Sequence, residues 1–229
     1  MVSHLGRTHH ALLLLLIMSS YDQLILSLKS ISESNKPNTI GAVLKKLNHF
    51  GFSLISLLLV LPFMQPIPVG PISVIGGMTF AALGLQLLKQ QKIPVLPHKI
   101  LNISLQQHHW QKITQVCMFI IKISKKITRP RLKNLVSNSL GLKCEGFILI
   151  AGGLLMAIPF GVLPLNNFFP GLAILFAALA QFEQDGLFIL ISFFWLIFSV
   201  FYFALFFLGI YLLGSEGINY LPEWLADWT

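Results

Sequence analysis

Apolar residues gather in long runs along this chain, and prolines and asparagines interrupt the two central runs. One interrupted run covers residues 61–90 and the other covers residues 158–186. The apolar arms that lead into them, 51–61 and 146–158, are short. About 20 helical residues are needed to cross the hydrocarbon core of a membrane. The pattern therefore predicts two helical hairpins whose arms are too short to span comfortably.

The two hairpins share sequence features at nearly constant spacing. A Pro-Phe pair at residues 62–63 recurs at residues 159–160, and a Phe-Ala-Ala-Leu segment at residues 80–83 recurs at residues 176–179. The first pair is separated by 97 residues and the second by 96. Self-similarity at a fixed period is typical of repeated architectures. The sequence predicts an internal duplication and leaves open whether the copies are parallel or inverted.

Prolines mark the break in each hairpin. Backbone groups that they leave unpaired are tolerated at membrane depth only inside protein or beside a watery cavity. Paired, interrupted apolar segments in two halves are typical of transporter binding sites. We expect re-entrant hairpins, and the alternative is ordinary hairpins with proline turns outside the membrane. The residues expected to break the helices are Pro62, Pro66, Pro159, Pro164 and Pro170.

Other segments predict simpler elements. Residues 187–213 hold 27 residues without charge, the one unambiguous spanning helix. Thr39 is placed to cap an amphipathic helix that carries Ile40, Val43, Leu44 and Leu47 on one face. Residues 112–127 mix apolar residues with lysines, which predicts an interfacial helix. Residues 1–18 contain an apolar run that is too short to span.

These elements predict an all-α protein in five segments. They are an N-terminal part with interfacial helices at 1–50, a first hairpin at 51–90, a basic connector at 91–143, a second hairpin at 144–186, and a spanning helix with its tail at 187–229.

Composition places this architecture in a membrane. The chain is 55% hydrophobic and 10% charged, whereas ordinary soluble domains carry about 25% charged residues. All 16 lysines and arginines lie at or before Lys143, and 11 of them fall between Lys89 and Lys143. Basic loops mark the cytoplasmic side. The connector is thus expected in the cytoplasm against anionic lipid, with no nucleic acid as partner.

A set of landmarks carries a resemblance to a known family. They are the proline-rich first hairpin, Gln86, Leu96-Pro97, Arg129-Pro130-Arg131, the segment from Pro159 to Pro170, and Asp185-Gly186. With these, the chain resembles the ExoD family of bacterial membrane proteins. The resemblance implies a multi-pass protein of the bacterial inner membrane with a role in exopolysaccharide production.

Polar residues near the breaks and arm ends are the candidate binding residues. Ionisable groups at membrane depth are costly and often mark ion pathways, and buried amides need partners. Glu183 and Asp185 would favour protons or a cationic solute such as a basic amino acid; alternatively, Asp185 caps the last helix. The arginines bind lipid phosphate or those acids, or are plain surface charge. The candidates are Gln86, Asn166, Asn167, Gln181, Glu183, Asp185, Arg129 and Arg131.

No pattern in the sequence predicts a metal site, a cofactor or an enzyme. The adjacent histidines 108–109 point about 100° apart on a helix, and the two cysteines have no metal spacing. No nucleophile–base set or phosphate loop occurs. We expect a small-solute or ion transporter that works as a homodimer. The alternative is a non-transporting scaffold or regulator of the exopolysaccharide machinery.

Overall fold

The computed structural model describes residues 26, 29–30, 38–47, 50–65, 70–127, 131–136, 138–158, 163 and 165–219. Within these residues the fold is helical, as predicted, apart from one short antiparallel ladder. The ladder pairs β1 (Asn38–Thr39) with β2 (Ser104–Leu105). The apolar run predicted within residues 1–18 lies outside the described residues.

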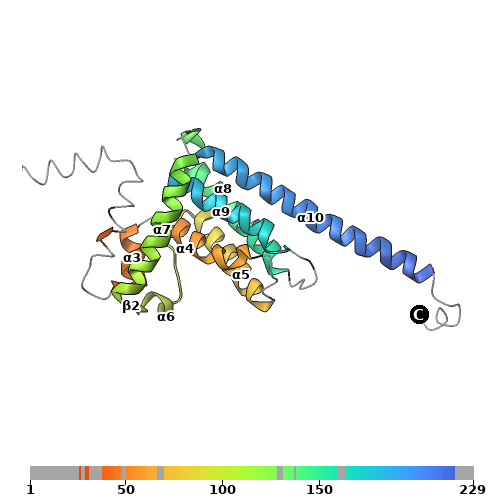
Figure 1. Cartoon of the computed structure of the whole chain (residues 1–229), viewed down its shortest axis with the longest axis horizontal. Coiled ribbons are helices and arrows are strands. Elements are labelled where there is room, and N and C mark those ends of the chain that lie inside the picture. The colour runs from red at the N-terminus through yellow and green to blue at the C-terminus, as the bar shows by residue number, and fades with distance from the viewer. Residues whose placement is uncertain are drawn as a thin grey trace, which may run out of the picture.

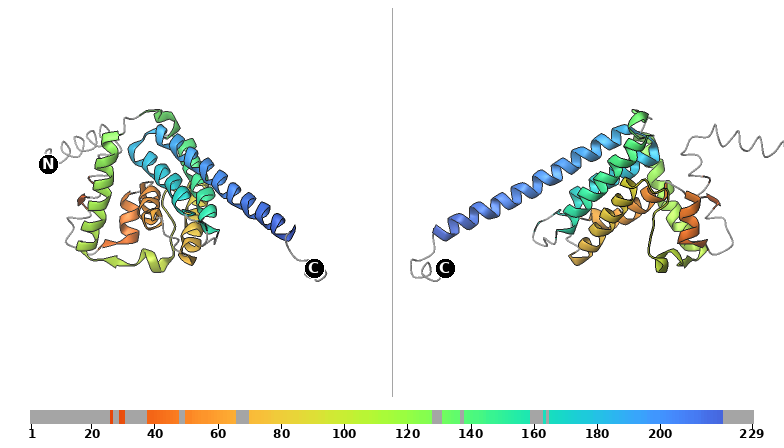
Figure 2. Two further views of the ribbon diagram at one scale, coloured as in Figure 1. Left: turned by 45° about the vertical axis from the view of Figure 1, so that its right-hand side comes forward. Right: turned by 180° about the vertical axis from the view of Figure 1, so that it is seen from behind.

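Four helices, α4, α5, α8 and α9, pack together, and α10 lies along them before it extends away (Figures 1 and 2). The helices in chain order are α3 (Ile40–Leu47), α4 (Phe50–Val60), η1 (Leu61–Met64), α5 (Pro71–Leu88), α6 (His98–Leu101), α7 (Gln107–Ile127), η2 (Lys133–Leu135), α8 (Ser139–Ala157), α9 (Phe168–Glu183) and α10 (Gly186–Asn219).

The amphipathic helix before the first hairpin forms as predicted. The amide of Ala42 donates to Thr39 Oγ1 at 3.2 Å, so the threonine caps α3. Val43, Leu44 and Leu47 are buried, while Lys45 is exposed. The helix thus turns its apolar face toward α4 and its charge toward the surroundings.

Three helices are long and apolar enough to cross a membrane: α5, α8 and the segment Gly186–Leu213 of α10. The chain is therefore a membrane protein with more candidate spans than the single one expected. Helix α8 begins at Ser139, seven residues before the predicted arm, so the boundary drawn at 143/144 falls inside it. The stretch from Ser139 to Gly146 contains no proline, and polar Lys143 and Cys144 are compatible with helical backbone. Re-entry of the hairpins stays a prediction.

Two of the prolines start helices and do not interrupt them. Pro71 is the first residue of α5, and Pro170 lies in the first turn of α9. A proline in a first turn costs little because its missing N–H would have no partner there. Pro170 was expected to break the second hairpin, and that expectation is wrong. Pro62 lies in the 3₁₀ turn η1, which follows α4 directly and does end the α-helix.

Glycines allow α5 and α8 to touch along their backbones. A Cβ on Gly77 would meet the carbonyl oxygen of Gly153, and one on Gly84 would meet that of Gly146. The reciprocal distances are 2.5 Å from a Cβ on Gly153 to Gly77 O and 2.9 Å from a Cβ on Gly146 to Gly84 O. In each helix the two glycines are seven residues, or two turns, apart. Close packing through small residues is typical of membrane helices. The pairing of Gly77 with Gly153 and of Gly84 with Gly146 shows that α5 and α8 are antiparallel.

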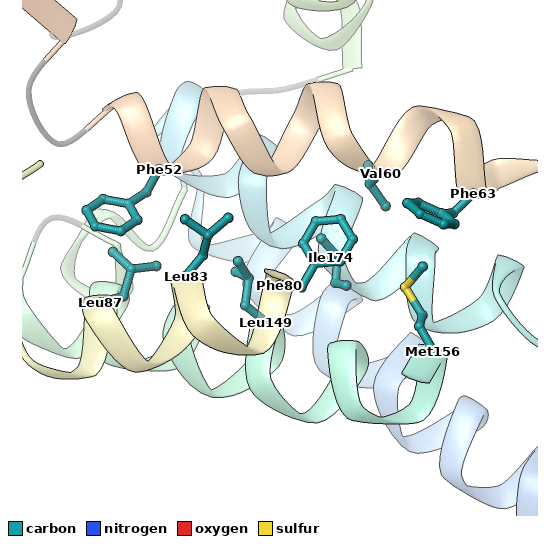
Figure 3. Packing of buried hydrophobic residues seen from close by; sticks show 9 residues of the cluster. All are labelled: Phe52, Val60, Phe63, Phe80, Leu83, Leu87, Leu149, Met156 and Ile174. Carbon is teal, nitrogen blue, oxygen red and sulfur yellow. The ribbon is translucent and has the colours of Figure 1, made fainter. Parts of the chain in front are cut away.

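Both hairpins point the same way. Phe63 packs on Phe80 with ring centroids 6.3 Å apart, so α5 folds back along α4. Figure 3 shows Phe52, Val60 and Phe63 facing Phe80 and the other core residues, which also come from α8 and α9. Helix α9 runs antiparallel to α4, because Gly171 lies against Met64 and Val60 at the break. An inverted orientation, left open by the sequence, is not found between these two described hairpins.

Candidate functional site

The breaks of the two hairpins lie together at one end of the four-helix unit. The 3₁₀ turn η1 contacts α9, and a Cβ on Gly171 would lie 3.2 Å from Met64 Sδ. Asn166 and Asn167 form the turn before α9, and both are buried. The side chain of Asn167 is 2% exposed, and neither Oδ1 nor Nδ2 has a hydrogen-bond partner in the described part of the chain. A buried amide without partners is a costly arrangement that a bound polar molecule would relieve.

Gln86 lies at the opposite end of α5 and already has partners. Its Nε2 donates to Val95 O at 3.1 Å, and the Val95 amide donates to its Oε1 at 2.7 Å. The side chain thus fastens the extended start of the connector to α5. This geometry does not bring Gln86 to the asparagines at the breaks.

Asp185 caps the last helix, which was the structural alternative for this residue. Its carboxylate Oδ1 accepts from the Leu187 amide at 3.0 Å, and Gln184 before it adopts a left-handed conformation with φ 51°. The side chain is 1% exposed. The Gly186 amide donates to Arg131 O at 2.9 Å, so the 131–132 strap crosses the start of α10. Asp185 and Arg131 therefore meet at the end that faces away from the breaks.

The remaining candidates divide by how they are placed. Arg131 is exposed, and Glu183 is the last residue of α9, with nothing described for its side chain. Gln181 is buried, and its Nε2 has no partner within the described residues. The candidates that lie outside the described residues are Arg129, Pro66, Pro159 and Pro164.

Sequence reasoning missed Glu145, which is fully enclosed in α8 at 0% exposure. Ser53 Oγ of α4 donates to Glu145 Oε1 at 3.1 Å, and Oε2 has no partner among the described residues. The missed signal was that Glu145 is the sole acid within the apolar stretch 140–157. Its neighbour Lys143 made it resemble surface charge at the end of the basic connector.

The histidine pair lies on the exposed first turn of α7. The rings of His108 and His109 have centroids 4.1 Å apart. The charge of His109, then slight desolvation and Lys112, lower the pKa of His108 below its ordinary value. Among the described residues no three His, Cys, Asp or Glu side chains gather as a metal site would require.

Comparison with known proteins finds one family model and one curated relative with similar sequences. The family model described as "Exopolysaccharide synthesis, ExoD" matches residues 22–205. Protein ExoD of Rhizobium meliloti (strain 1021) is 29% identical over 166 residues, which cover 72% of this chain and 69% of that protein. The chain belongs to the ExoD family. The ExoD match includes both hairpins and most of the final candidate span, and it links the chain to exopolysaccharide synthesis. No solved structure matches the chain.

A cavity of about 320 Å³ lies apart from the candidate residues of this ExoD-family chain. It opens between α3, α4 and α7, and none of the predicted binding residues lines it. Its walls are apolar: Ile40, Val43, Leu44, Leu54, Ile55, Leu58, Leu59, Leu96, Trp110 and Ile113. Such a lining is suited to a hydrocarbon chain and offers little to a polar solute.

Proposed function

We propose that this ExoD-family chain is a transporter of a small solute or ion in the bacterial inner membrane, with its solute site where the two breaks meet. The buried amide of Asn167, which has no hydrogen-bond partner among the described residues, is the observation that supports this site most. Asn166 lies beside it, and η1 of the first hairpin packs against the start of α9. The breaks of both hairpins therefore contribute to one polar site within the otherwise apolar four-helix unit.

The chemistry at the breaks favours a solute that both donates and accepts hydrogen bonds. An amide offers one acceptor oxygen and two donor hydrogens. No charged residue occurs in the sequence from Leu61 to Leu88 or from Ala157 to Phe182. The cationic solute expected from Glu183 and Asp185 loses support, because Asp185 is engaged as a helix cap at the other end. Neutral polar solutes are thus the first class to test.

The distribution of charge supports an orientation in the membrane. Lys89 follows α5, and Lys143 lies in the second turn of α8, so exposed basic residues occupy the end opposite the breaks. Basic loops favour the cytoplasmic side. Full crossings of α5 and α8 would then face the breaks toward the periplasm, whereas re-entrant hairpins would hold them at membrane depth on the connector side. We infer no enzymatic step for this chain.

Transport by purified full-length chain in proteoliposomes tests this proposal. We expect uptake of at least one neutral polar solute, and at least a tenfold lower rate for Asn167→Leu, which keeps the volume but removes the amide. Asn102→Leu, in the exposed turn after α6, is the control and should retain the wild-type rate. Equal rates for the two variants, or no uptake of any solute, would instead favour the scaffold of the exopolysaccharide machinery.

The proposed assembly is a homodimer, because a unit of this size with short α4 and α9 encloses little space. A strictly monomeric mass in mild detergent would contradict it.

A further inference from the structure

The polar core around Glu145 lies apart from the breaks, toward the connector end of α8. Glu145 lies in the second turn of α8, close to the connector end of the helix. Among the described residues its one hydrogen-bond partner is the hydroxyl of Ser53, which lies 3.1 Å from Oε1. Ile148 and Leu149, one turn further along α8, are fully buried in hydrophobic clusters. A carboxyl group is thus enclosed in apolar protein with one hydrogen bond.

Among the described side chains, no cationic group compensates this carboxyl group from the helices that pack around it. Helices α4 and α5 contain no titratable residue. The other elements that pack on α8 also carry titratable residues. These are Glu183 at the end of α9, Lys133 in η2 and Tyr202, the first titratable residue along α10. On α8 itself, Lys143 is exposed and Cys144 is half-buried. Lys89, which follows α5, is exposed, and Asp185 is an acid that accepts a hydrogen bond from the Leu187 amide.

An ionised carboxylate is poorly stabilised in this place. Burial of an unpaired charge in apolar surroundings is very costly, and the group ordinarily takes up a proton instead. One hydroxyl donor at Oε1 does not replace hydration of both oxygens. A metal cation is also poorly stabilised, because hard cations require six or more oxygen ligands and, of the described residues, only Ser53 Oγ is within hydrogen-bond distance of the carboxyl group. The closed core therefore favours the neutral acid.

Two unsatisfied donors lie on the neighbouring helices. Ser56 Oγ is one turn from Ser53 on the same face of α4, and Gln181 Nε2 is on α9; both are buried and without partners in the described part of the chain. Gln181 is level with Glu145 along the helices. A Cβ on Gly152 of α8 would lie 3.1 Å from Ile174 Cγ1 of α9. Because the two helices are antiparallel, two turns back along α8 reach Glu145 and two turns forward along α9 reach Gln181. A small displacement of these helices would offer the carboxylate more donors.

We propose that Glu145 is a proton-binding site within the four-helix core. In the closed core the carboxyl group holds its proton. When α4 and α9 shift relative to α8, the O–H bond breaks and the proton passes to water on the connector side, while Ser53, Ser56 and Gln181 donate to the carboxylate that remains. For its physiological role this inference rests on the proposed transport, where Glu145 supplies proton coupling.

Infrared difference spectroscopy of the full-length chain in lipid bilayers tests the proton directly and requires no solute. We expect a carbonyl band of a protonated, buried carboxyl group near neutral pH that declines as the pH is raised. Glu145→Gln should remove the band, while Glu216→Gln, at the far end of α10, should retain it. Should Glu145→Gln fail to fold, Ser53→Ala is informative, because loss of the hydrogen bond shifts the band to higher frequency without removing it.

Several outcomes would overturn the inference. They are the absence of the band from the wild-type chain, its persistence in Glu145→Gln, an unchanged frequency in Ser53→Ala, and a response to sodium or potassium at constant pH. The two proposals fail separately. A pH-sensitive band without uptake in proteoliposomes would contradict the proposed transport and support the proton-binding site. Uptake without the band would support transport and contradict the proton-binding site.

Discussion

Gln86 illustrates how one side chain fixes the local path of the backbone. Its amide makes both possible bonds to the backbone of Val95, at 3.1 Å and 2.7 Å. Replacement by leucine removes both, each worth about 1 kcal/mol net. We predict that Gln86→Leu accelerates hydrogen exchange at the Val95 amide by about fivefold, because this amide loses the one bond that it donates to Gln86 Oε1.

Residue-resolved hydrogen exchange in detergent measures this rate, and Gln91→Leu is a matched control because that glutamine is exposed in the same connector. Unchanged exchange at Val95 in Gln86→Leu would mean that the amide is protected by something other than Gln86. Transport should survive Gln86→Leu, since the side chain is engaged away from the breaks.

Residue by residue, the sequence identified polar positions better than it identified their roles. Asn166 and Asn167 are buried before α9, where asparagines in an apolar run stand out, and their role in binding stays a prediction. Glu145 was missed because its hydrogen-bond partner, Ser53, lies 92 residues earlier, and because polar Lys143 concealed the helix start. Asp185 had two alternatives, and only the backbone geometry of Gln184 and Leu187 decided for the cap.

At the scale of elements, the α5–α8 contact depends on glycine. Addition of one methyl group at Gly77 or at Gly153 would place it against a carbonyl oxygen of the facing helix. Overpacking typically costs about 1–3 kcal/mol. We predict that Gly77→Ala and Gly153→Ala each lower the thermal unfolding midpoint in detergent, followed by tryptophan fluorescence.

The control has the opposite sign. A Cβ on Gly209 of α10 meets nothing within 4 Å. Alanine is the better helix former by about 1 kcal/mol, so Gly209→Ala should leave the midpoint unchanged or raise it. Equal destabilisation at all three glycines would show that the α5–α8 contact is not specific.

The elements themselves were predictable to different degrees. The capped amphipathic helix α3 and the uncharged segment 187–213 within α10 follow from local patterns, and both are confirmed. The lengths of α5 and α8 were not predicted, because Pro71 starts α5 and the residues from Ser139 continue α8 toward the connector. The common direction of the hairpins depends on glycine contacts between distant segments, which spacing alone does not reveal.

At the scale of the whole molecule, helix length decides where the breaks lie relative to the membrane. Helix α5 has 18 residues and α8 has 19, which is about 27–29 Å of helix against a hydrocarbon core of about 30 Å. Both helices run between the connector and the breaks. Full crossings would place the breaks at the face opposite the basic connector, while re-entrant hairpins would hold them at membrane depth on the connector side.

A matched pair of exposed glutamines separates these two topologies. Gln65 follows η1 at the break, and Gln91 lies in the connector. With Cys117 and Cys144 replaced by serine, we predict that a membrane-impermeant thiol reagent labels Gln65→Cys on intact bacterial cells and labels Gln91→Cys only after the inner membrane is opened. Labelling of Gln65→Cys only after opening would establish re-entrant hairpins, and the proposed solute site would then open to the cytoplasm. Labelling of Gln91→Cys on intact cells would reverse the orientation assigned from the basic residues, and Glu145 would then exchange its proton with the periplasm.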